Sequence, residues 1–263
     1  NTTDYPTEDQ QFEAYKQVLS DMDGKEVIIR TLDIGADKQI GYFDLPKEDN
    51  PAMGMRALRI CLTRPEIFKT QLRALFRASA FGKLGIMFPM VTSVWEVREA
   101  KKLCEEVKRE LKHEGTPYSE DVQIGIMIET PAAAVMSDRL AKEVDFFSIG
   151  TNDLTQYTLA ADRTLGSVAN YQTAWHPAVL RAIKLIADAG NANGMPVGVC
   201  GEAAADPDLA VVLTGIGVNS LSMTPVALDD VRAELAGVTL EEAQEKAAKA
   251  LNGDFYNPSE WNI

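Results

Sequence analysis

Short apolar runs alternate with longer amphipathic stretches along almost the whole chain, and this alternation limits the possible folds more than any other feature. Most of the short runs are apolar throughout instead of alternating with polar residues. Strands of that kind are buried on both faces, which is typical of a parallel sheet covered by helices. Seven runs predict strands: Val27–Leu32, Ala57–Leu62, Gly85–Met90, Gln123–Ile128, Phe146–Ile149, Pro196–Cys200 and Ser220–Met223.

The stretches between these runs predict helices, and several carry a start signal. Four prolines stand at the first position of a predicted helix, where a missing N–H costs little. Thr239 and Glu242 have the spacing of a capping box. The predicted helices are Glu8–Met22, Pro65–Ser79, Val94–Lys112, Pro131–Leu140, Asp153–Ala160, Pro177–Ala192, Pro207–Thr214, Leu228–Leu235 and Leu240–Leu251.

Strands and helices in this order favour an α/β fold, and specifically a (β/α)8 barrel of the TIM type over an open sheet. Such a barrel has eight strands, so we expect its first strand to lie upstream of Asn1. Residues 1–251 are expected to form one barrel domain of a larger enzyme, and residues 252–263 a C-terminal tail. The 263 residues, 46% of them hydrophobic, are ample for the core of one large domain.

Charge and cysteine usage exclude several classes of function. The chain carries 26 basic and 39 acidic residues, a net charge of −13, so nucleic acid and anionic membranes are poor partners. No apolar run is long enough to span a bilayer, and no signal pattern opens the chain. Cys61, Cys104 and Cys200 are far apart, as expected for reduced thiols of a cytoplasmic protein. The two histidines exclude a histidine-rich metal site; His113 is predicted at a solvated helix end and His176 at a helix cap.

Two carboxylates stand directly after predicted strands. In barrels of this kind the chemistry is built at the C-terminal ends of the strands. Glu129 follows a buried run, where a carboxylate has to be paired, protonated or bound to a cation. Asp153 closes the turn after another strand. Two carboxylates with substrate oxygens suit Mg²⁺; the alternative is that Glu129 caps the helix at Pro131 and that Thr151, Asn152 and Asp153 cap the next helix.

Three arginines, one amide and one thiol complete a set on the same predicted strand ends. Arginines clamp oxygens in a fork, which suits a small polyanionic substrate such as a phosphorylated carboxylate. The residues are Arg30, Arg56, Arg163, Asn152 and Cys200. Each has another interpretation: Arg30 as a paired structural arginine, Arg56 as a solvated arginine at a helix start, and Cys200 as a buried core thiol.

Long motifs in the sequence resemble a known family. The segment DFFSIGTNDLTQYTLAADR, with GIMIETPAA before it and GVCGE after it, resembles the phosphoenolpyruvate-utilising enzymes. Within that family, RTLDIGADK, NPAMGMRALRICL and RASAFGKLGIMFPM are most similar to Enzyme I of the bacterial sugar phosphotransferase system. The resemblance covers nearly the whole chain and implies a (β/α)8 barrel that binds phosphoenolpyruvate and Mg²⁺.

The resemblance also implies roles for individual residues. Glu129 and Asp153 would hold Mg²⁺, while Arg30, Arg56 and Arg163 would grip the phosphate and carboxylate oxygens of phosphoenolpyruvate.

The remaining matched residues lie around this centre. Asn152 would bind substrate through its amide or its backbone, and Cys200 would be the general acid that protonates the enolate to give pyruvate. Asp33 and Lys38 match a family motif and are assigned only to supporting the pocket.

The chain departs from the family pattern in two respects. The N-terminal half with its phospho-accepting histidine is absent, and so is an arginine of the first strand. We therefore expect a domain that binds phosphoenolpyruvate but does not by itself catalyse phosphoryl transfer. The resemblance implies a homodimer formed through this domain, and a phosphocarrier protein that docks on the absent half.

Two alternatives to an Enzyme I domain remain at this point. One is the barrel of a pyruvate phosphate dikinase or phosphoenolpyruvate synthase, in which the histidine domain exchanges phosphate with a nucleotide. The other is a non-catalytic phosphoenolpyruvate-sensing module. The sequence also leaves open whether the parent enzyme serves sugar uptake or a nitrogen-regulatory branch.

Overall fold

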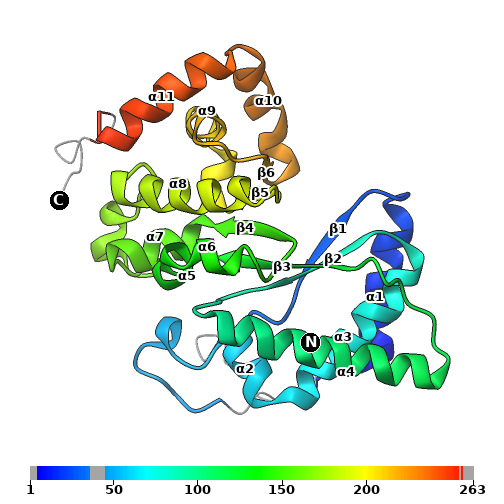
Figure 1. The fold of residues 1–263 in the computed structure, drawn as a ribbon. Helices are drawn as coiled ribbons and strands as arrows, with labels where there is room; N and C mark the ends of the chain where they lie inside the picture. Colours follow the sequence, from blue (N-terminus) through cyan, green and yellow to red (C-terminus); the bar gives the residue numbers. More distant parts are fainter. Residues whose placement is uncertain (1–4, 36–44, 255, 257–263) are drawn as a thin grey trace. The chain divides into compact units, whose positions relative to one another are not determined.

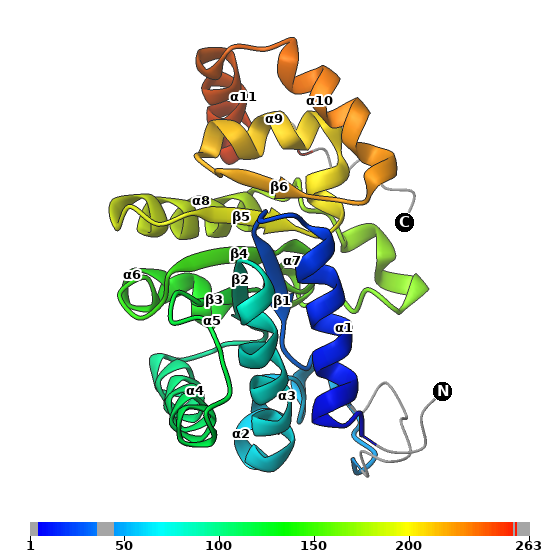
Figure 2. The same cartoon turned by 90° about the vertical axis from the view of Figure 1, so that its right-hand side faces the viewer.

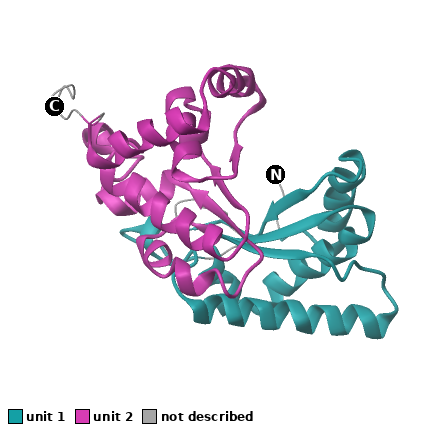
Figure 3. Cartoon of the chain, turned by 45° about the horizontal axis from the view of Figure 1, so that its top comes forward, with its two compact units in different colours: residues 1–126 teal, residues 127–263 magenta. Residues whose placement is uncertain are grey.

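The computed structural model describes residues 5–35, 45–254 and 256. The chain divides into two compact units, residues 1–126 and 127–263, which are coloured separately in Figure 3. Strand β3 (Gln123–Ile128) begins in the first unit, and its last two residues belong to the second.

The first unit contains parallel strands covered by helices. Strand β2 pairs with β1 in the register Arg30↔Met87 and with β3 in the register Phe88↔Ile126. Helix α3 packs against α1 and α4, and Figure 2 shows α1 alongside α3. Its elements are α1 (Glu8–Asp21), β1 (Val27–Arg30), η2 (Pro51–Met53), α2 (Leu58–Thr63), α3 (Pro65–Ala78), η3 (Ser79–Phe81), β2 (Leu84–Phe88) and α4 (Val94–Glu114).

Large apolar side chains form the core of this unit. Helix α3 buries Phe68, Leu72, Leu75 and Phe76. The ring of Phe68 meets that of Phe88 edge to face, with the ring centroids 5.9 Å apart, a spacing typical of aromatic pairs. All five residues of β2 are buried, as expected for a strand covered on both faces.

The second unit has the same parallel α/β organisation. Strand β5 pairs with β4 and β6, and the register Gly150↔Cys200 places the ends of β4 and β5 side by side. Helix α9 packs against α10 and α11 (Figure 1). Its elements are α5 (Pro131–Val135), α6 (Ser137–Leu140), β4 (Phe146–Gly150), α7 (Thr151–Leu159), η4 (Gly166–Tyr171), α8 (Pro177–Ala192), β5 (Val197–Cys200), η5 (Glu202–Ala205), α9 (Pro207–Ile216), β6 (Ser220–Ser222), η6 (Pro225–Ala227), α10 (Leu228–Ala236) and α11 (Leu240–Asn252).

The parallel α/β class predicted from the sequence is confirmed. The described residues form six strands, and within each unit the strand order follows the order along the chain, as in (β/α)8 barrels. The eight-stranded barrel and the single domain over residues 1–251 stay predictions. None of the helices in the described ranges is long and apolar enough to cross a membrane.

One predicted strand is wrong. Residues Ala57–Leu62 were expected to extend, but Leu58–Thr63 form helix α2. Leu58, Ile60 and Cys61 are buried while Arg59 reaches back to the carbonyl groups of Met53 and Gly54. A short apolar run fits a buried helix as well as a buried strand, because periodicity alone does not separate them over six residues.

The helix signals were more reliable than the short apolar run. Proline occupies the first turn of α3, α5, α8 and α9, and Thr239 with Glu242 forms the expected capping box. The predicted helix Pro131–Leu140 is interrupted at Met136 (ψ 13°) and becomes α5 and α6. Of the tail at 252–263, only residues 252–254 and 256 lie within the described part.

Candidate active site

Glu129 leaves the end of β3 and lies against the backbone of Gly150. Its side chain is buried, with 1% of the residue exposed. A Cβ atom at Gly150 would lie 2.7 Å from the Oε2 atom of Glu129, so only glycine leaves room for this carboxylate. The helix cap considered for Glu129 is instead provided by Thr130, whose Oγ1 accepts the N–H of Ala133 at 3.1 Å.

Asp153 lies in the first turn of α7 and is paired with Arg163. The Nη1 atom of Arg163 is 3.4 Å from the Oδ2 atom of Asp153, and the aspartate side chain is only 10% exposed. The backbone N–H of Arg163 donates to Gln156 Oε1 at 2.9 Å, which fixes the loop that carries the arginine. The N-cap of α7 is Gly150 and no side chain caps this helix, so the capping interpretation of Thr151, Asn152 and Asp153 is wrong.

Asn152 and its neighbour Thr151 join the start of α7 to the end of β5. Thr151 Oγ1 donates to the carbonyl of Cys200 at 3.0 Å, and Asn152 Oδ1 accepts the N–H of Glu202 at 3.2 Å. Gly201 lies between these contacts with φ +103°, a conformation that side chains disfavour. Its own Cβ would lie 2.7 Å from Thr151 Oγ1, so glycine is required here for space as well.

The thiol of Cys200 is half-buried and surrounded by polar atoms. Ser148 Oγ donates to Cys200 Sγ at 3.3 Å, and Sγ donates to the carbonyl of Ile149 at 3.5 Å. The interpretation of Cys200 as a simple core thiol does not describe this environment. Sequence reasoning missed Ser148, although a polar residue inside the apolar strand β4 was a usable signal.

In the first unit, Asp33 holds both predicted arginines. Arg30 Nη1 lies 3.3 Å from Asp33 Oδ2, and Arg56 Nη2 lies 3.1 Å from Asp33 Oδ1. The side chain of Arg56 is 11% exposed, so it is not a solvated arginine at a helix start. The supporting role expected for Asp33 agrees with this geometry, while Lys38 lies outside the described residues.

The carboxylates of the second unit fit Mg²⁺ as part of a substrate complex. Within the described ranges, no three or more histidine, cysteine, aspartate or glutamate residues gather in a way that could hold a metal ion. Glu129 and Asp153 supply two oxygen donors beside the start of α7. Mg²⁺ is commonly bound by one or two carboxylates together with waters and substrate phosphate. The donor set therefore suits this cation when a phosphorylated substrate completes it.

Fold and site together define an α/β protein whose polar residues gather at the carboxyl ends of parallel strands. Residues 1–240 match the family described as PEP-utilising enzyme, PEP-binding domain. The chain belongs to this family.

Individual relatives agree with the family match. The chain is 50% identical to a phosphoenolpyruvate-protein phosphotransferase of Staphylococcus epidermidis over 246 residues, which is 94% of this chain. It is equally similar, at 50% over 246 residues, to the protein of that name from Haemophilus influenzae. In each case it spans 43% of the length of the curated relative.

A solved structure supports the fold alone. A citrate lyase from Burkholderia xenovorans superposes with a TM-score of 0.50 at 20% identity, covering 73% of this chain and 60% of that one. This likeness agrees with the α/β architecture and says nothing of the chemistry.

Proposed function

We propose that this chain is the phosphoenolpyruvate-binding catalytic domain of a phosphoenolpyruvate-protein phosphotransferase, an Enzyme I. Residues 1–251 would form a TIM-type barrel domain that binds the substrate with Mg²⁺. The observation that carries the proposal is the grouping of two buried carboxylates, a paired arginine and a hydrogen-bonded thiol around the ends of β3, β4 and β5. The name shared by the two curated relatives favours a phosphotransferase over a dikinase, a synthase or a sensing module.

Substrate binding is assigned to cationic and amide groups. Arg30, Arg56 and Arg163 would bind the phosphate and carboxylate oxygens, with Asn152 as an additional contact. Arginine suits this task because its planar fork pairs with two oxygens at once. Asp33 keeps the guanidinium groups of Arg30 and Arg56 together before substrate arrives.

Glu129 and Asp153 would hold Mg²⁺, which when bound neutralises charge on the phosphoryl oxygens. Both carboxylates are buried, so they are preorganised and lose little freedom on binding. The phosphoryl group would pass to a histidine of a separate N-terminal domain and leave the enolate of pyruvate.

Cys200 would then protonate the enolate. The S–H proton moves to the terminal carbon, giving pyruvate and a thiolate that regains its proton from solvent. The Ser148 hydroxyl donates to Sγ at 3.3 Å, an arrangement that stabilises the thiolate.

The partners follow from the same proposal. The intact enzyme would be a cytoplasmic homodimer of a phosphotransferase system, in sugar transport or in a nitrogen-regulatory branch, and its histidine domain would pass the phosphoryl group to a phosphocarrier protein. This chain alone would bind phosphoenolpyruvate and release no pyruvate, because the acceptor histidine belongs to the other domain.

The test is calorimetric titration of phosphoenolpyruvate into the chain with Mg²⁺, then with excess chelator. We expect binding that depends on Mg²⁺ and is lost in Glu129→Gln. The matched control is Glu245→Gln, on the exposed face of α11, which should bind as the wild type does. Absence of binding to the folded chain, or binding that neither the chelator nor Glu129→Gln weakens, would overturn the proposal.

A further inference from the structure

The segment that carries Asp33 leaves the sheet and is then held by hydrogen bonds from helices. The N–H of Thr31 still donates to the carbonyl of Met87 on β2, at 3.0 Å. The next N–H, that of Leu32, instead donates to the side-chain Oε1 of Gln71 on α3, at 2.9 Å. Beyond Asp33, the carbonyl of Ile34 accepts the N–H of Ala57 at 2.9 Å. Asp33 therefore lies between two hydrogen bonds that do not belong to the sheet.

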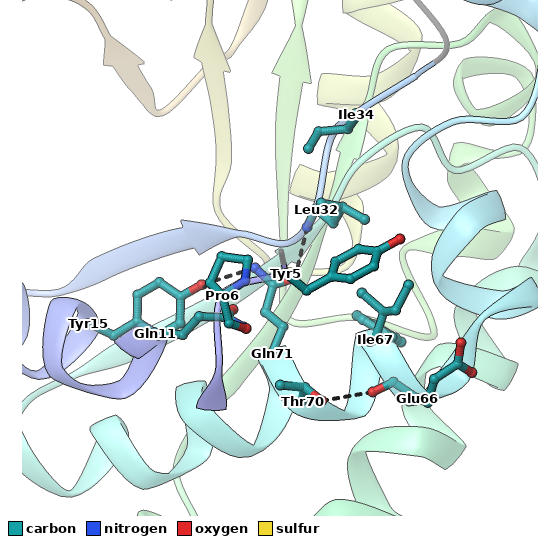
Figure 4. Close-up of a pocket in the computed structure, with 11 residues that line it drawn as sticks. Tyr5, Pro6, Gln11, Tyr15, Leu32, Ile34, Glu66, Ile67, Thr70 and Gln71 are labelled. Atoms are coloured by element: carbon teal, nitrogen blue, oxygen red, sulfur yellow. Dashed lines mark hydrogen bonds between the residues drawn. The ribbon is translucent and has the colours of Figure 1, made fainter. Parts of the chain in front are cut away.

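Gln71 is itself fixed by a chain of hydrogen bonds to α1. Its Nε2 donates to the hydroxyl of Tyr15 at 3.1 Å, and that hydroxyl donates to Gln11 Oε1 at 3.2 Å. Gln11 Nε2 in turn donates to the carbonyl of Pro6 at 3.0 Å. Figure 4 shows Gln71 between the Tyr15 hydroxyl and the Leu32 N–H. Burial raises the pKa of Tyr15, so the hydroxyl remains a donor throughout the neutral range.

A cavity of about 420 Å³ borders the same residues (Figure 4). Tyr5, Pro6, Tyr15, Leu32, Ile34 and Gln71 contribute to its wall. Because the cavity replaces close packing on this side, the backbone of the segment depends more on hydrogen bonds than on neighbouring side chains. It also gives space for a substituted side chain at position 71.

We propose that Gln71 is a positioning residue: through the Leu32 N–H it fixes the segment that carries Asp33, and so sets the place of the Arg30 and Arg56 guanidinium groups. The inference rests on the proposed function, in which these arginines bind phosphoenolpyruvate. A carboxamide suits the place because it accepts from the Leu32 N–H with one atom and donates to Tyr15 with the other. Leucine would do neither. Glutamate would accept from Leu32 and also from Tyr15, at the expense of the contact between Tyr15 and Gln11.

The first experiment follows the arginines without any ligand. We would record the backbone amide of Leu32 and the Nε–Hε groups of Arg30 and Arg56 by NMR in the wild type and in Gln71→Leu. All three resonances should move. Gln17→Leu is the control. Gln17 is exposed on α1, and its side-chain amide donates to the carboxylate of Asp21, away from the segment that carries Asp33. A shift of the Leu32 amide resonance with both arginine resonances unchanged would overturn the inference.

The second experiment measures phosphoenolpyruvate binding with Mg²⁺ in the same variants. Gln71→Leu should weaken binding about tenfold, because the part-buried hydrogen bond that holds the Leu32 N–H is lost, while Gln71→Glu should recover most of the affinity. Gln17→Leu should bind as the wild type does. Equal affinities of Gln71→Leu and wild type would overturn the inference. If the wild type itself fails to bind, the proposed function fails, and the ligand-independent NMR shifts still decide the role of Gln71.

A milder variant covers the case in which Gln71→Leu does not fold. Tyr15→Phe removes one hydroxyl from the chain of hydrogen bonds and should weaken binding about threefold and move the arginine signals in the same direction. Tyr5→Phe removes a hydroxyl from the same cavity wall, one that accepts a hydrogen bond from Arg64 Nη1 at 3.4 Å. Equal effects of Tyr15→Phe and Tyr5→Phe would contradict the proposed role.

Discussion

The Nη1 atom of Arg163 lies 3.4 Å from the Oδ2 atom of Asp153. The residue assigned to substrate oxygens is thus paired with one assigned to the metal. Only 7% of the whole Asp153 residue is exposed, and a carboxylate with so little contact with water needs a partner of opposite charge. The guanidinium group of Arg163 provides that charge. A divalent cation at Asp153 would compete with Arg163 for the same carboxylate, and would turn the arginine toward the substrate.

This competition predicts opposite effects in Arg163→Met. Mg²⁺ alone should bind about threefold more tightly, because a nearby positive charge is removed from a partly exposed pair. Phosphoenolpyruvate should bind at least about tenfold more weakly, because a charge-assisted hydrogen bond to the substrate is lost. Separate calorimetric titrations of the two ligands would measure both effects.

The matched control is Arg139→Met, at an exposed arginine 3.6 Å from Asp138. It should leave both affinities unchanged. Parallel losses of Mg²⁺ and substrate binding in Arg163→Met would show that the arginine supports the fold of the site and does not compete with the metal.

Gly201 provides a second prediction, about backbone geometry. Alanine there would occupy φ +103° and place its Cβ 2.7 Å from Thr151 Oγ1 and 3.0 Å from Asn152 Oδ1. Those side chains would have to leave Cys200 and Glu202, so we expect a loss of about 3 kcal/mol in the free energy of unfolding. Urea denaturation would measure it, with substrate binding weakened as well.

Gly194→Ala separates backbone strain from steric conflict. Gly194 also has a positive φ, +66°, but nothing lies within 4 Å of the Cβ position. We expect a loss of only about 1 kcal/mol, since the conformation alone is disfavoured. Equal losses in the two variants would mean that the contacts of Thr151 and Asn152 contribute nothing to stability.

The three cysteines should differ in reactivity. Burial raises the pKa of Cys61 and of Cys104 from 9.0 to about 12, whereas Cys200 is half-buried. A raised pKa keeps the proton on sulfur, so the reactive thiolate of the two buried residues forms only as the pH approaches that value. A disulfide reagent at pH 8 should modify one thiol per native chain and three in denaturant. Cys200→Ser should reduce the native value to zero; modification of a second thiol in the folded wild type would contradict this prediction.

Local rules predicted the elements best where a chemical signal was present. Proline at the first helical turn and the pair Thr239 and Glu242 marked helix starts that the structure contains. The run at Ala57–Leu62 carried no such signal, and tertiary burial of Leu58 and Ile60 decided in favour of a helix. Propensity is a weak guide for a run of that length.

The candidate site was predictable as a set of residue types but not as a set of contacts. Strand ends identified Glu129 and Asp153, since buried carboxylates stand out in apolar surroundings. The sequence did not show that Asp33 would join Arg30 to Arg56, because the contact between Asp33 and Arg56 spans 23 residues and depends on the path after β1. Gln71 was missed for the same reason: its partner Leu32 is 39 residues away, and a glutamine on a half-exposed helix face carries no local signal.

The N-cap of α8 is a histidine whose ring can titrate. His176 was expected at this cap, and its Nδ1 accepts the N–H of Ala178 at 3.0 Å. Burial lowers the pKa of His176 below its ordinary 6.5, so the folded state favours the neutral ring. The stabilisation is therefore present above pH 6.5 and is lost as the pH falls through the lowered pKa, because a protonated Nδ1 has no lone pair to accept with.

Replacing His176 by Asn should remove this pH dependence, since asparagine caps a helix in either condition. Between pH 7 and pH 5, the wild type should lose about 0.5 kcal/mol more unfolding free energy than His176→Asn, a small difference because the ring is partly exposed to solvent. Urea denaturation at both pH values would measure the difference. His113→Asn, at an exposed position in the last turn of α4, is the control and should follow the wild type. If the free energy of unfolding falls equally with pH in His176→Asn and in the wild type, protonation of the His176 ring does not weaken the helix cap. Another group would then cause the loss of stability at low pH.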